Sequence, residues 1–394
     1  MNSLEPTAGK DRIVSIDSMR GFAILGIFLV NMLSFHSPIL YLDPFKWWEG
    51  SANLAVYRLI DLFVQASFYP LFAMLFGYGL VLFQERTLEK GLSFPKLAFR
   101  RLGFLAIMGL LHALFIWHGD ILFNYAMLGF LFLLFIRMRG TGLLLTGTLL
   151  YILPNLLFSG LLLLSVLIAP ADQMNTYDMK EAKASLEIYQ NGTFIEIMNQ
   201  RVTDWYGVNN LVGLIFSIVT IFPFFFIGAW AGKVKLFENV AKHRKTMMWV
   251  AVVFFGLGLL IKSVPYVIER NLFIEYVQDI FGGPLFAIAY ALCIALLFER
   301  KRVQKWLLPL AAVGKLSLSN YLLQSIIFTL IFYQYGLGLY GNVSVVAGTM
   351  IAIAFFICQI LVSRIWVKNY YYGPFEWVWR SVTYGSWQRW KKQS

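Results

Sequence analysis

Three charged residues stand at the start of a long apolar segment near the N-terminus. They are Arg12, Asp17 and Arg20, in the stretch RIVSIDSMRGFAILGIFLVNM. Ionisable side chains at a membrane boundary are costly, so such a group predicts a site with a partner. The planar guanidinium of arginine suits phosphate or carboxylate, and Asp17 can hold Arg20 in place. One interpretation is a site for an anionic ligand, such as the phosphates of a nucleotide-like cofactor; the other is anchoring by positive charge with a local ion pair.

Three of the four histidines could take part in proton transfer. His36 follows the first apolar segment, whereas His112 and His118 lie with Asp120 in GLLHALFIWHGDILFNYA. A histidine beside a carboxylate can act as a general base or a proton relay. Asp120 could equally cap a helix in a Gly-Asp turn. His112 lies in an apolar interior and is the favoured catalytic candidate, while His36 is either functional or an interfacial residue that tolerates both media.

Two further apolar segments carry polar residues that could complete a site. Asp61 lies early in the second segment, and it could face a common cavity with Asn31, Ser34 and His36 if the first two segments are neighbours. In GKLSLSNYLLQS, a polar stripe follows one helical face and consists of Ser317, Asn320, Tyr321 and Gln324. Such a stripe either joins helices by hydrogen bonds or lines a polar cavity. The bulky amides favour the cavity.

Several kinds of chemistry are excluded by what the sequence lacks. The two cysteines, Cys293 and Cys358, both lie in apolar segments, so neither disulfides nor thiolate metal ligands are predicted. His112 and His118 are too far apart for a zinc pair on one helical turn. No G-x-x-x-x-G-K-S/T, G-x-S-x-G, H-E-x-x-H or Rossmann fingerprint occurs. Pumping driven by nucleotide hydrolysis would therefore need a separate subunit.

The elements that must position these residues are membrane helices. Hydrophobic residues make up 59% of the 394 residues and charged residues 14%, whereas soluble domains carry about a quarter charged residues. Lipid admits only helices or closed barrels, and the apolar runs lack the alternation of a barrel. We predict an all-α, polytopic membrane bundle of about ten transmembrane helices. The spans are expected near residues 20–37, 56–83 (with a surface helix followed by a shorter span as the alternative), 99–117, 121–137, 142–168, 211–232, 247–267, 280–298, 307–333 and 343–366.

Positive charges orient this bundle. Basic residues fill every second connection and the C-terminal tail, while the intervening connections are neutral or acidic. By the positive-inside rule, both termini are expected in the cytoplasm of a multi-pass protein of the cell (plasma) membrane. The net charge of +12 then reflects topology, and no single basic face predicts binding to nucleic acid. The expected partners are the lipid bilayer and a small-molecule substrate.

A polar, acidic connection divides the chain into two halves. Residues 1–168 form an N-terminal five-helix half with the Arg-Asp-Arg and histidine motifs, 169–210 an extracellular polar loop, and 211–394 a C-terminal five-helix half. The last half ends in the aromatic, basic tail YYYGPFEWVWRSVTYGSWQRW, expected to form a membrane-surface helix in the cytoplasm. Glu376 and Arg380 are spaced as i,i+4 partners there, and a ligand-facing role is the less favoured alternative.

Four of these motifs, taken in order, resemble a known family. They are RIVSIDSMRGFAILGIFLVN, GLLHALFIWHGDILFNYA, GKLSLSNYLLQS and YYGPFEWVWRSVTYG, and they resemble the YeiB-like bacterial membrane proteins (domain of unknown function 418), especially the Bacillus members. More distantly, the R-x-x-x-x-D-x-x-R-G opening is similar to the acyltransferase-3 proteins and to heparan-α-glucosaminide N-acetyltransferase. Those enzymes move an acyl group from cytosolic acyl-CoA to a sugar hydroxyl or amine across the membrane.

The distant resemblance carries implications for individual residues. It implies that Asp17 and Arg20 belong to an inner-face element of that fold, and that Asp61 is similar to the aspartate preceding a second helix in the acetyltransferase. Where the acyltransferase-3 pattern has a histidine near the end of the first span, this chain has Asn31. Asparagine cannot act as a base, so acyl transfer would need His36 or His112.

The resulting expectation is an O- or N-acyltransferase without a covalently bound cofactor. Acyl-CoA would be the co-substrate and would enter from the cytoplasm near Arg12 and Arg20, with Asp17 beside them. The catalytic candidates are His36, His112 and Asp61. A hydroxylated, sugar-like acceptor would approach from outside, and the candidates for its contacts are Asn31, His118, Asp120, Asn320 and Gln324.

Two alternatives use the same residues differently. The first is a transporter or exporter of a small molecule or lipid-linked compound, with His112 and Asp61 coupling it to protons. The second is a membrane sensor without catalysis. A homodimer would follow only from the acetyltransferase resemblance.

Overall fold

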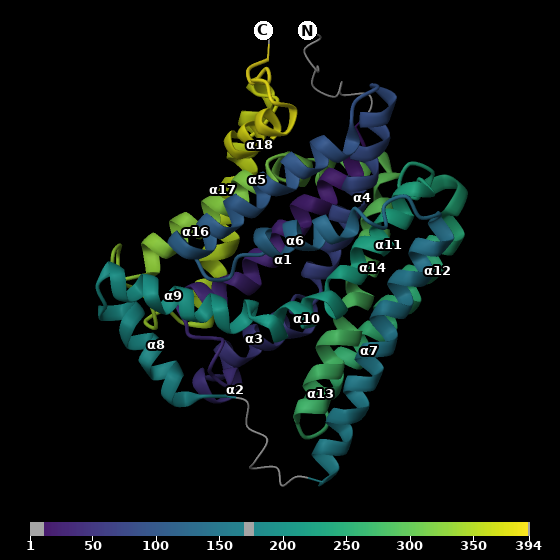
Figure 1. The fold of residues 1–394 in the computed structure, drawn as a ribbon. Helices are drawn as coiled ribbons and strands as arrows, with labels where there is room; N and C mark the ends of the chain where they lie inside the picture. The colour runs from purple at the N-terminus through teal and green to yellow at the C-terminus, as the bar shows by residue number, and fades with distance from the viewer. Residues whose placement is uncertain (1–11, 169–176, 393–394) are drawn as a thin grey trace.

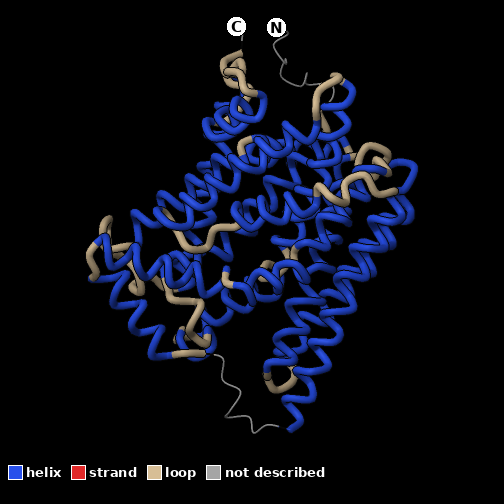
Figure 2. Tube along the Cα trace, viewed as in Figure 1, coloured by secondary structure: helices blue, strands red, loops and turns tan. Residues whose placement is uncertain are grey.

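The computed structural model describes residues 12–168 and 177–392, and the regular secondary structure of this part of the chain is helical, apart from one isolated bridge between Tyr370 and Lys391 (Figures 1 and 2). The elements are α1 (Val14–His36), α2 (Pro44–Trp47), α3 (Ser51–Phe63), α4 (Phe68–Glu89), α5 (Phe94–Phe115), α6 (Leu122–Phe132), α7 (Gly140–Ile168), α8 (Met179–Asn191), α9 (Phe194–Asn209), α10 (Leu211–Thr220), α11 (Phe222–Lys233), α12 (Val240–Ser263), α13 (Leu272–Val277), α14 (Gly283–Phe298), α15 (Lys301–Lys315), α16 (Ser317–Phe332), α17 (Val345–Asn369) and α18 (Pro374–Tyr384). The prediction of an all-α membrane bundle is confirmed.

The number of spans differs from the ten that were expected. Eight helical segments in the described chain are long and apolar enough to cross a membrane, and a ninth is obtained if α15 and α16, bent by 74°, count as one span. The segment expected at 121–137 is α6, which has 11 residues. At 1.5 Å per residue it reaches only about half of a hydrocarbon core of ~30 Å. The expected second span consists of two helices, α3 and α4, as the sequence allowed.

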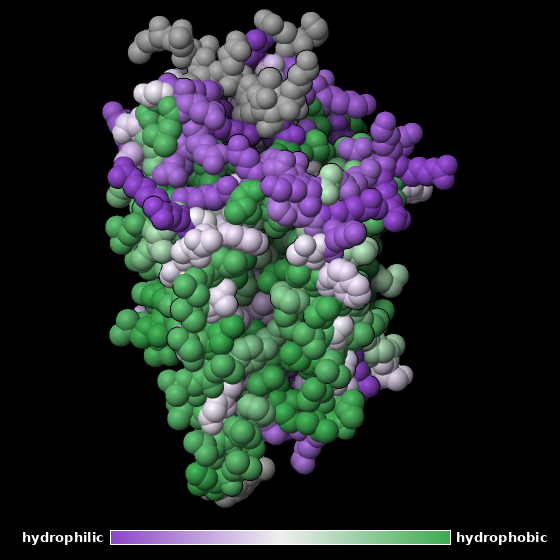
Figure 3. Space-filling model, turned by 90° about the vertical axis from the view of Figure 1, so that its right-hand side faces the viewer, coloured by the Kyte–Doolittle hydropathy of each residue, from purple (hydrophilic) through white to green (hydrophobic). Residues whose placement is uncertain are grey.

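The outer surface of these helices is apolar. Figure 3 shows a broad hydrophobic band on the side of the molecule that carries α12, with a hydrophilic zone at one end. Exposed side chains on α7 and α12 include Leu157, Leu164, Leu167, Trp249, Val252 and Leu260, each more than half accessible. Soluble monomers rarely expose so large an apolar surface, and lipid is the solvent that suits it.

Glycines allow two close helix crossings that position the site. A Cβ atom at Gly314 of α15 would lie 1.8 Å from the carbonyl oxygen of Asp17, and one at Gly21 of α1 would lie 2.0 Å from that of Leu310. Small residues at a crossing let two backbones touch, which is how membrane helices gain packing contacts. The crossing of α1 and α15 therefore brings the Arg-Asp-Arg motif next to Lys315. The crossing of α4 and α11 is built in the same way around Gly77 and Gly228.

The connection expected at 169–210 is largely helical where the structure describes it, and residues 169–176 lie outside the described part. The Asp178 side chain caps α8, and Thr193 and Glu196 form a capping box at the start of α9. These helix-capping residues can be recognised in the sequence. They stabilise helices in a segment whose polar composition suggests a loop. α9 packs against α5, so this segment covers one end of the bundle (Figure 1).

Candidate functional site

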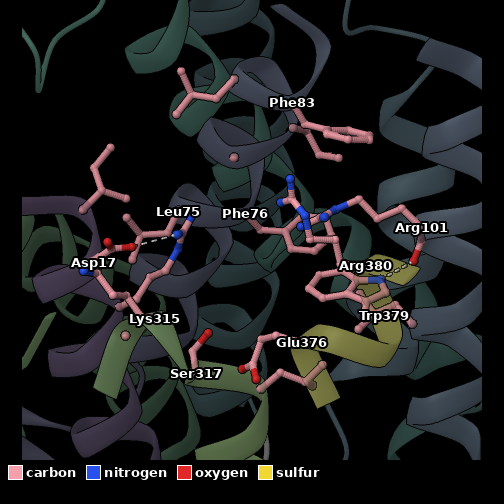
Figure 4. Close-up of a pocket in the computed structure, with 18 of the residues that line it drawn as sticks. Asp17, Leu75, Phe76, Phe83, Arg101, Lys315, Ser317, Glu376, Trp379 and Arg380 are labelled. Atoms are coloured by element: carbon pink, nitrogen blue, oxygen red, sulfur yellow. Dashed lines mark hydrogen bonds and ion pairs between the residues drawn. The ribbon is translucent and has the colours of Figure 1, made fainter. Parts of the chain in front are cut away.

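A cavity of about 300 Å³ opens at the end of the bundle where α18 meets the beginning of α1 (Figures 1 and 4). Its mouth is lined by basic side chains and two carboxylates, and its depth by apolar and aromatic ones. The basic residues are Arg12, Arg20, Arg86, Lys90, Arg101, Lys315 and Arg380. In Figure 4, Asp17 and Lys315 lie on one side, Arg101, Trp379 and Arg380 on the other, and Ser317 and Glu376 between them. An excess of positive charge surrounds the opening.

The Arg-Asp-Arg motif forms one wall of this mouth. Asp17 is 2% exposed. Its carboxylate accepts hydrogen bonds from Arg12 Nε and Nη2, and from Arg20 Nη1 at 3.3 Å. The expected ion pair is therefore present. Because one carboxylate faces two guanidinium groups, the wall keeps a net positive charge toward the cavity.

Helix α18 forms the opposite wall. The guanidinium of Arg101 lies 3.9 Å from the centre of a Trp379 ring, and Trp379 Nε1 donates to the Arg101 carbonyl oxygen at 2.7 Å. The Arg380 guanidinium lies 5.0 Å from the rings of both Tyr372 and Tyr384. Arg380 Nε is buried without a hydrogen-bond partner among the described residues. These cations are held by aromatic rings rather than by carboxylates, so their charge remains available to a ligand.

Glu376 does not pair with Arg380, although the spacing suggested it. Its carboxylate accepts from the backbone N–H of Ser319 at 2.9 Å and from the Ser319 hydroxyl. Ser319 lies in the first turn of α16, where free N–H groups and the helix dipole favour an anion. Burial raises the pKa of Glu376, and the hydrogen bonds from Ser319 oppose that shift. The carboxylate thus fastens α18 to α16 at the cavity wall.

The deep end of the cavity reaches the second sequence motif. Tyr321 lines the cavity, its hydroxyl donates to the Gly119 carbonyl oxygen at 3.3 Å, and its ring lies 5.3 Å from that of His112. His112 Nδ1 is 2.9 Å from Asp120 Oδ1, and both side chains are buried. Because a carboxylate accepts, Nδ1 carries the proton and Nε2 keeps its lone pair. His112 Nε2 has no hydrogen-bond partner in the described chain.

Asp120 makes both of the contacts that the sequence suggested, one with a histidine and one with a helix N-terminus. Its second oxygen, Oδ2, accepts from the backbone N–H of Phe123 at 2.8 Å, which caps the start of α6. Its first oxygen orients His112. The hydrogen bond from the Phe123 N–H therefore holds the Asp120 carboxylate in place, and this carboxylate sets the tautomer of His112.

His118 has other partners than His112, namely Ser34 and Asp204, and its ring neighbours that of Trp117. Its Nε2 lies 3.2 Å from Ser34 Oγ, and its Nδ1 lies 3.7 Å from Asp204 Oδ2. Burial lowers the pKa of His118, and the Asp204 carboxylate opposes that shift. The two histidines six residues apart thus pair with two different carboxylates.

Like His112, the other two catalytic candidates, His36 and Asp61, are not among the residues that line the cavity. His36 is 1% exposed, contacts the Phe332 and Trp48 rings, and has neither ring nitrogen hydrogen-bonded in the described chain. Asp61 accepts from Gln278 Nε2 at 2.6 Å and from the Tyr266 hydroxyl. No contact joins either residue to His112 within the described segments. Neither Asp61 nor His36 lines the cavity beside the Arg-Asp-Arg motif.

The polar stripe on α16 divides between two roles. Ser317 and Tyr321 line the cavity. The Asn320 side chain donates to Ser363 Oγ at 3.1 Å, and Gln324 Nε2 donates to Gln359 Oε1 at 2.8 Å. Both acceptors lie on α17, so these two amides join helices, which was the alternative to a substrate contact. Asn31 is half-buried on α1 and does not line the cavity either.

Several lining residues escaped the sequence reasoning. The positive-inside rule explains Arg86, Lys90 and Arg101 as charges of one cytoplasmic connection, and it assigns no role to Lys315. The cavity gathers these residues from the C-terminal end of α4, the beginning of α5 and the C-terminal end of α15. The C-terminal tail carried a signal of a ligand site, because it mixes tryptophans with basic residues. Anchoring of a helix at the membrane surface explained the same pattern. Among the residues described, no three His, Cys, Asp or Glu side chains group as a metal site.

Sequence comparisons place the chain among known proteins. A family model described as "Protein of unknown function (DUF418)" matches residues 231–386. "Uncharacterized protein YxaH" of Bacillus subtilis (strain 168) is 36% identical, over 98% of each chain. "Uncharacterized protein YeiB" of Escherichia coli (strain K12) is 30% identical, over 95% of this chain and 96% of its own. The "Uncharacterized 39.9 kDa protein in amylase 3'region" of Bacillus acidopullulyticus is 27% identical, over 97% and 96%. With this coverage, the chain belongs to the YeiB-like DUF418 family of multi-pass membrane proteins.

Proposed function

We propose that the protein is an acyltransferase of the plasma membrane that takes an acyl group from cytoplasmic acyl-CoA and transfers it to a hydroxylated acceptor. One observation carries the proposal: a single cavity has a cationic, aromatic mouth and an apolar depth that ends at Tyr321, whose ring lies 5.3 Å from that of His112 in the buried His112–Asp120 pair. The charge pattern of the chain predicts that this basic end faces the cytoplasm.

The mouth suits the nucleotide part of the donor. Acyl-CoA carries phosphates and an adenine ring at one end. Arg20, Arg101 and Lys315 supply charges for phosphates, and Trp379 offers an aromatic surface. Asp17 holds Arg20 in position, and the wall keeps a net positive charge. A neutral sugar or a cation would gain little from such an opening.

The depth suits the acylated arm. Ile24, Ile27, Leu75 and Phe76 line the inner part, so an acyl chain entering there leaves water. Ligand cavities in proteins measure roughly 300–1,000 Å³. The 300 Å³ found here is at the small end of that range. It fits the thioester arm with the nucleotide held at the mouth.

His112 is the general base in this proposal. Asp120 fixes the proton on Nδ1, which leaves Nε2 free to accept one. The acceptor hydroxyl loses its proton to Nε2 as its oxygen bonds to the thioester carbon. The C–S bond then breaks, and the coenzyme A thiolate takes the proton from His112.

Binding and transfer by the purified protein in lipid nanodiscs test this proposal. Acetyl-CoA and longer acyl-CoAs should bind saturably, and Arg20→Ala should weaken binding by about tenfold or more, equivalent to ~1.4 kcal/mol. Arg137→Ala is the matched control, because Arg137 is exposed and does not line the cavity. Absence of binding by folded protein, or equal loss in both variants, would overturn the proposal.

A second candidate function rests on a separate network. Lys262 is fully buried in α12, 2.9 Å from Asp279 Oδ1, and Gln278 joins this pair to Asp61. Ionisable groups inside a membrane commonly serve ion-coupled transport. Saturable flux in proteoliposomes that depends on a proton gradient and is lost in Asp61→Asn would favour a transporter instead.

A further inference from the structure

A buried polar group outside the cavity joins three segments that are distant in sequence. Ser34 lies near the end of α1, His118 in the turn between α5 and α6, and Asp204 in α9. Ser34 Oγ is 3.2 Å from His118 Nε2, and His118 Nδ1 is 3.7 Å from Asp204 Oδ2. A serine, a histidine and an aspartate in this order of contact form the arrangement that activates a serine, whichever fold carries it.

The hydrogen bonds decide which nitrogen of His118 is the base. Burial raises the pKa of Tyr189, so this hydroxyl keeps its single proton. It donates that proton to Asp204 Oδ2 at 2.7 Å. Toward His118 Nδ1, 3.4 Å away, it can therefore only accept. Nδ1 carries the histidine proton, and Nε2 presents its lone pair to Ser34.

The aspartate is held firmly in this position. Asp204 is 2% exposed, and its other oxygen accepts from the Tyr41 hydroxyl at 2.6 Å and from Gln200 Nε2 at 2.8 Å. A carboxylate fixed by three donors fixes the histidine in turn, directly and through Tyr189. A hydrogen bond between Ser34 and His118 would be enough to join two helices. The further hydrogen bonds that orient His118 through Tyr189 and Asp204 are not needed for packing.

The surroundings also offer access and unused donors. Ser34 is half-buried, whereas His118 and Asp204 are buried, so Ser34 is the most exposed of the three residues. Trp117 Nε1 and the Nε and Nη2 atoms of Arg201 are buried without hydrogen-bond partners in the described chain. The Trp117 and His118 rings are 5.6 Å apart, and the charge of Arg201 lowers the pKa of His118. Unpaired donors at such a place can stabilise an oxyanion.

We propose that Ser34 is a nucleophile that accepts an acyl group from an ester or thioester. Ser34 Oγ bonds to the acyl carbon while its proton passes to His118 Nε2. The C–O or C–S bond of the substrate breaks, and the leaving alkoxide or thiolate takes that proton. A hydroxyl acceptor or water then loses a proton to His118 and attacks the Ser34 ester, and the serine oxygen regains a proton. This goes beyond the proposed function, because it requires neither acyl-CoA nor the cavity.

Covalent labelling with a fluorophosphonate tests the nucleophile directly. Attack by Ser34 Oγ forms an O–P bond, releases fluoride and passes the proton to His118. The full-length protein in lipid nanodiscs is treated with the probe, digested and analysed by mass spectrometry for the modified residue. The expected result is an adduct on Ser34 whose formation slows about 100-fold in His118→Gln, the scale of general base catalysis.

Matched variants separate activation from folding. Ser37→Ala is the control, since Ser37 lies three residues further on and its hydroxyl donates only to a backbone carbonyl. It should label like the wild type, whereas Ser34→Ala should not label at that peptide. Tyr189→Phe keeps the ring and removes the hydroxyl between His118 and Asp204, so labelling should slow several-fold. The assignment would be overturned if folded, monodisperse wild type formed no adduct on Ser34. It would also be overturned if the His118→Gln and Tyr189→Phe variants were labelled at the same rate as the wild type.

Discussion

His112 Nδ1, near the end of α5, lies 2.9 Å from Asp120 Oδ1 in the turn that follows, and the His112 ring is 5.3 Å from that of Tyr321, which lines the cavity. The two residues are eight positions apart, and the turn folds them onto each other. Because Asp120 is also bonded to the Phe123 N–H, the pair is rigid. A rigid, oriented imidazole suits catalysis better than packing.

His112→Gln should therefore abolish acyl transfer and leave acyl-CoA binding unchanged. Glutamine keeps polarity and approximate size, but it cannot accept the acceptor's proton. A loss of about 100-fold or more in turnover, with the same Kd, is expected from removal of a general base. Isothermal titration and a coenzyme A release assay would measure the two quantities. Unchanged turnover would show that another residue is the base.

Arg101→Ala should weaken acyl-CoA binding about tenfold, since a cavity-lining cation with an aromatic support is removed. Arg100→Ala is the matched control, because Arg100 is exposed and does not line the cavity. The affinity of the wild type should also fall with rising salt, as expected for phosphate contacts. Equal affinities in the two variants would remove Arg101 from the donor site.

The crossing of α1 and α15 should be intolerant of any side chain. In Gly314→Ala the new Cβ would lie 1.8 Å from the Asp17 carbonyl oxygen, so the helices must separate. Overpacking typically costs about 1–3 kcal/mol, and a lower Tm in lipid would report it. Gly103→Ala on α5 meets no atom within 4 Å and should be neutral or stabilising. Equal melting temperatures would contradict the close crossing.

Gln324→Ala should lower stability without affecting the donor site. Its amide bonds Gln359 on α17 and does not line the cavity. Interhelical hydrogen bonds in membranes are worth about 0.6 kcal/mol on average. A small fall in Tm with unchanged acyl-CoA affinity is expected. A tenfold loss of affinity would restore the substrate-binding role that the sequence suggested.

Labelling of Ser34 should depend on pH through His118. Burial lowers the pKa of His118 below its ordinary 6.5, Arg201 and His112 lower it further, and Asp204 opposes them. Because the neutral form is the base, labelling should be constant above pH 6.5 and fall only as the pH drops through the lowered pKa. Asp204→Asn removes the opposing charge, so its slower labelling should have a still lower midpoint. A midpoint at or above pH 6.5 would contradict a buried, neutral base.

Much of this architecture is readable in the chain. Hydrophobic runs locate most of the membrane helices, because lipid requires each backbone group to be satisfied locally. The Arg12–Asp17–Arg20 pairing is equally local, since Arg12 lies just before α1 and the other two residues lie in its first two turns. The capping box at Thr193 is another local signal. Such features depend on neighbours in sequence, so composition and spacing suffice to find them.

The sites, in contrast, are assembled from residues that sequence distance separates. Whether His118 pairs with Asp120 or with Asp204 depends on how α9 lies against the end of α5, and no local pattern encodes that contact. The side-chain amides of α16 bond to α17, and this contact too depends on how the two helices pack. The sequence by itself determined a polytopic helical membrane protein with its charge at one end. Only the tertiary structure decided which charges meet, because helix packing through glycine contacts sets distances that periodicity cannot.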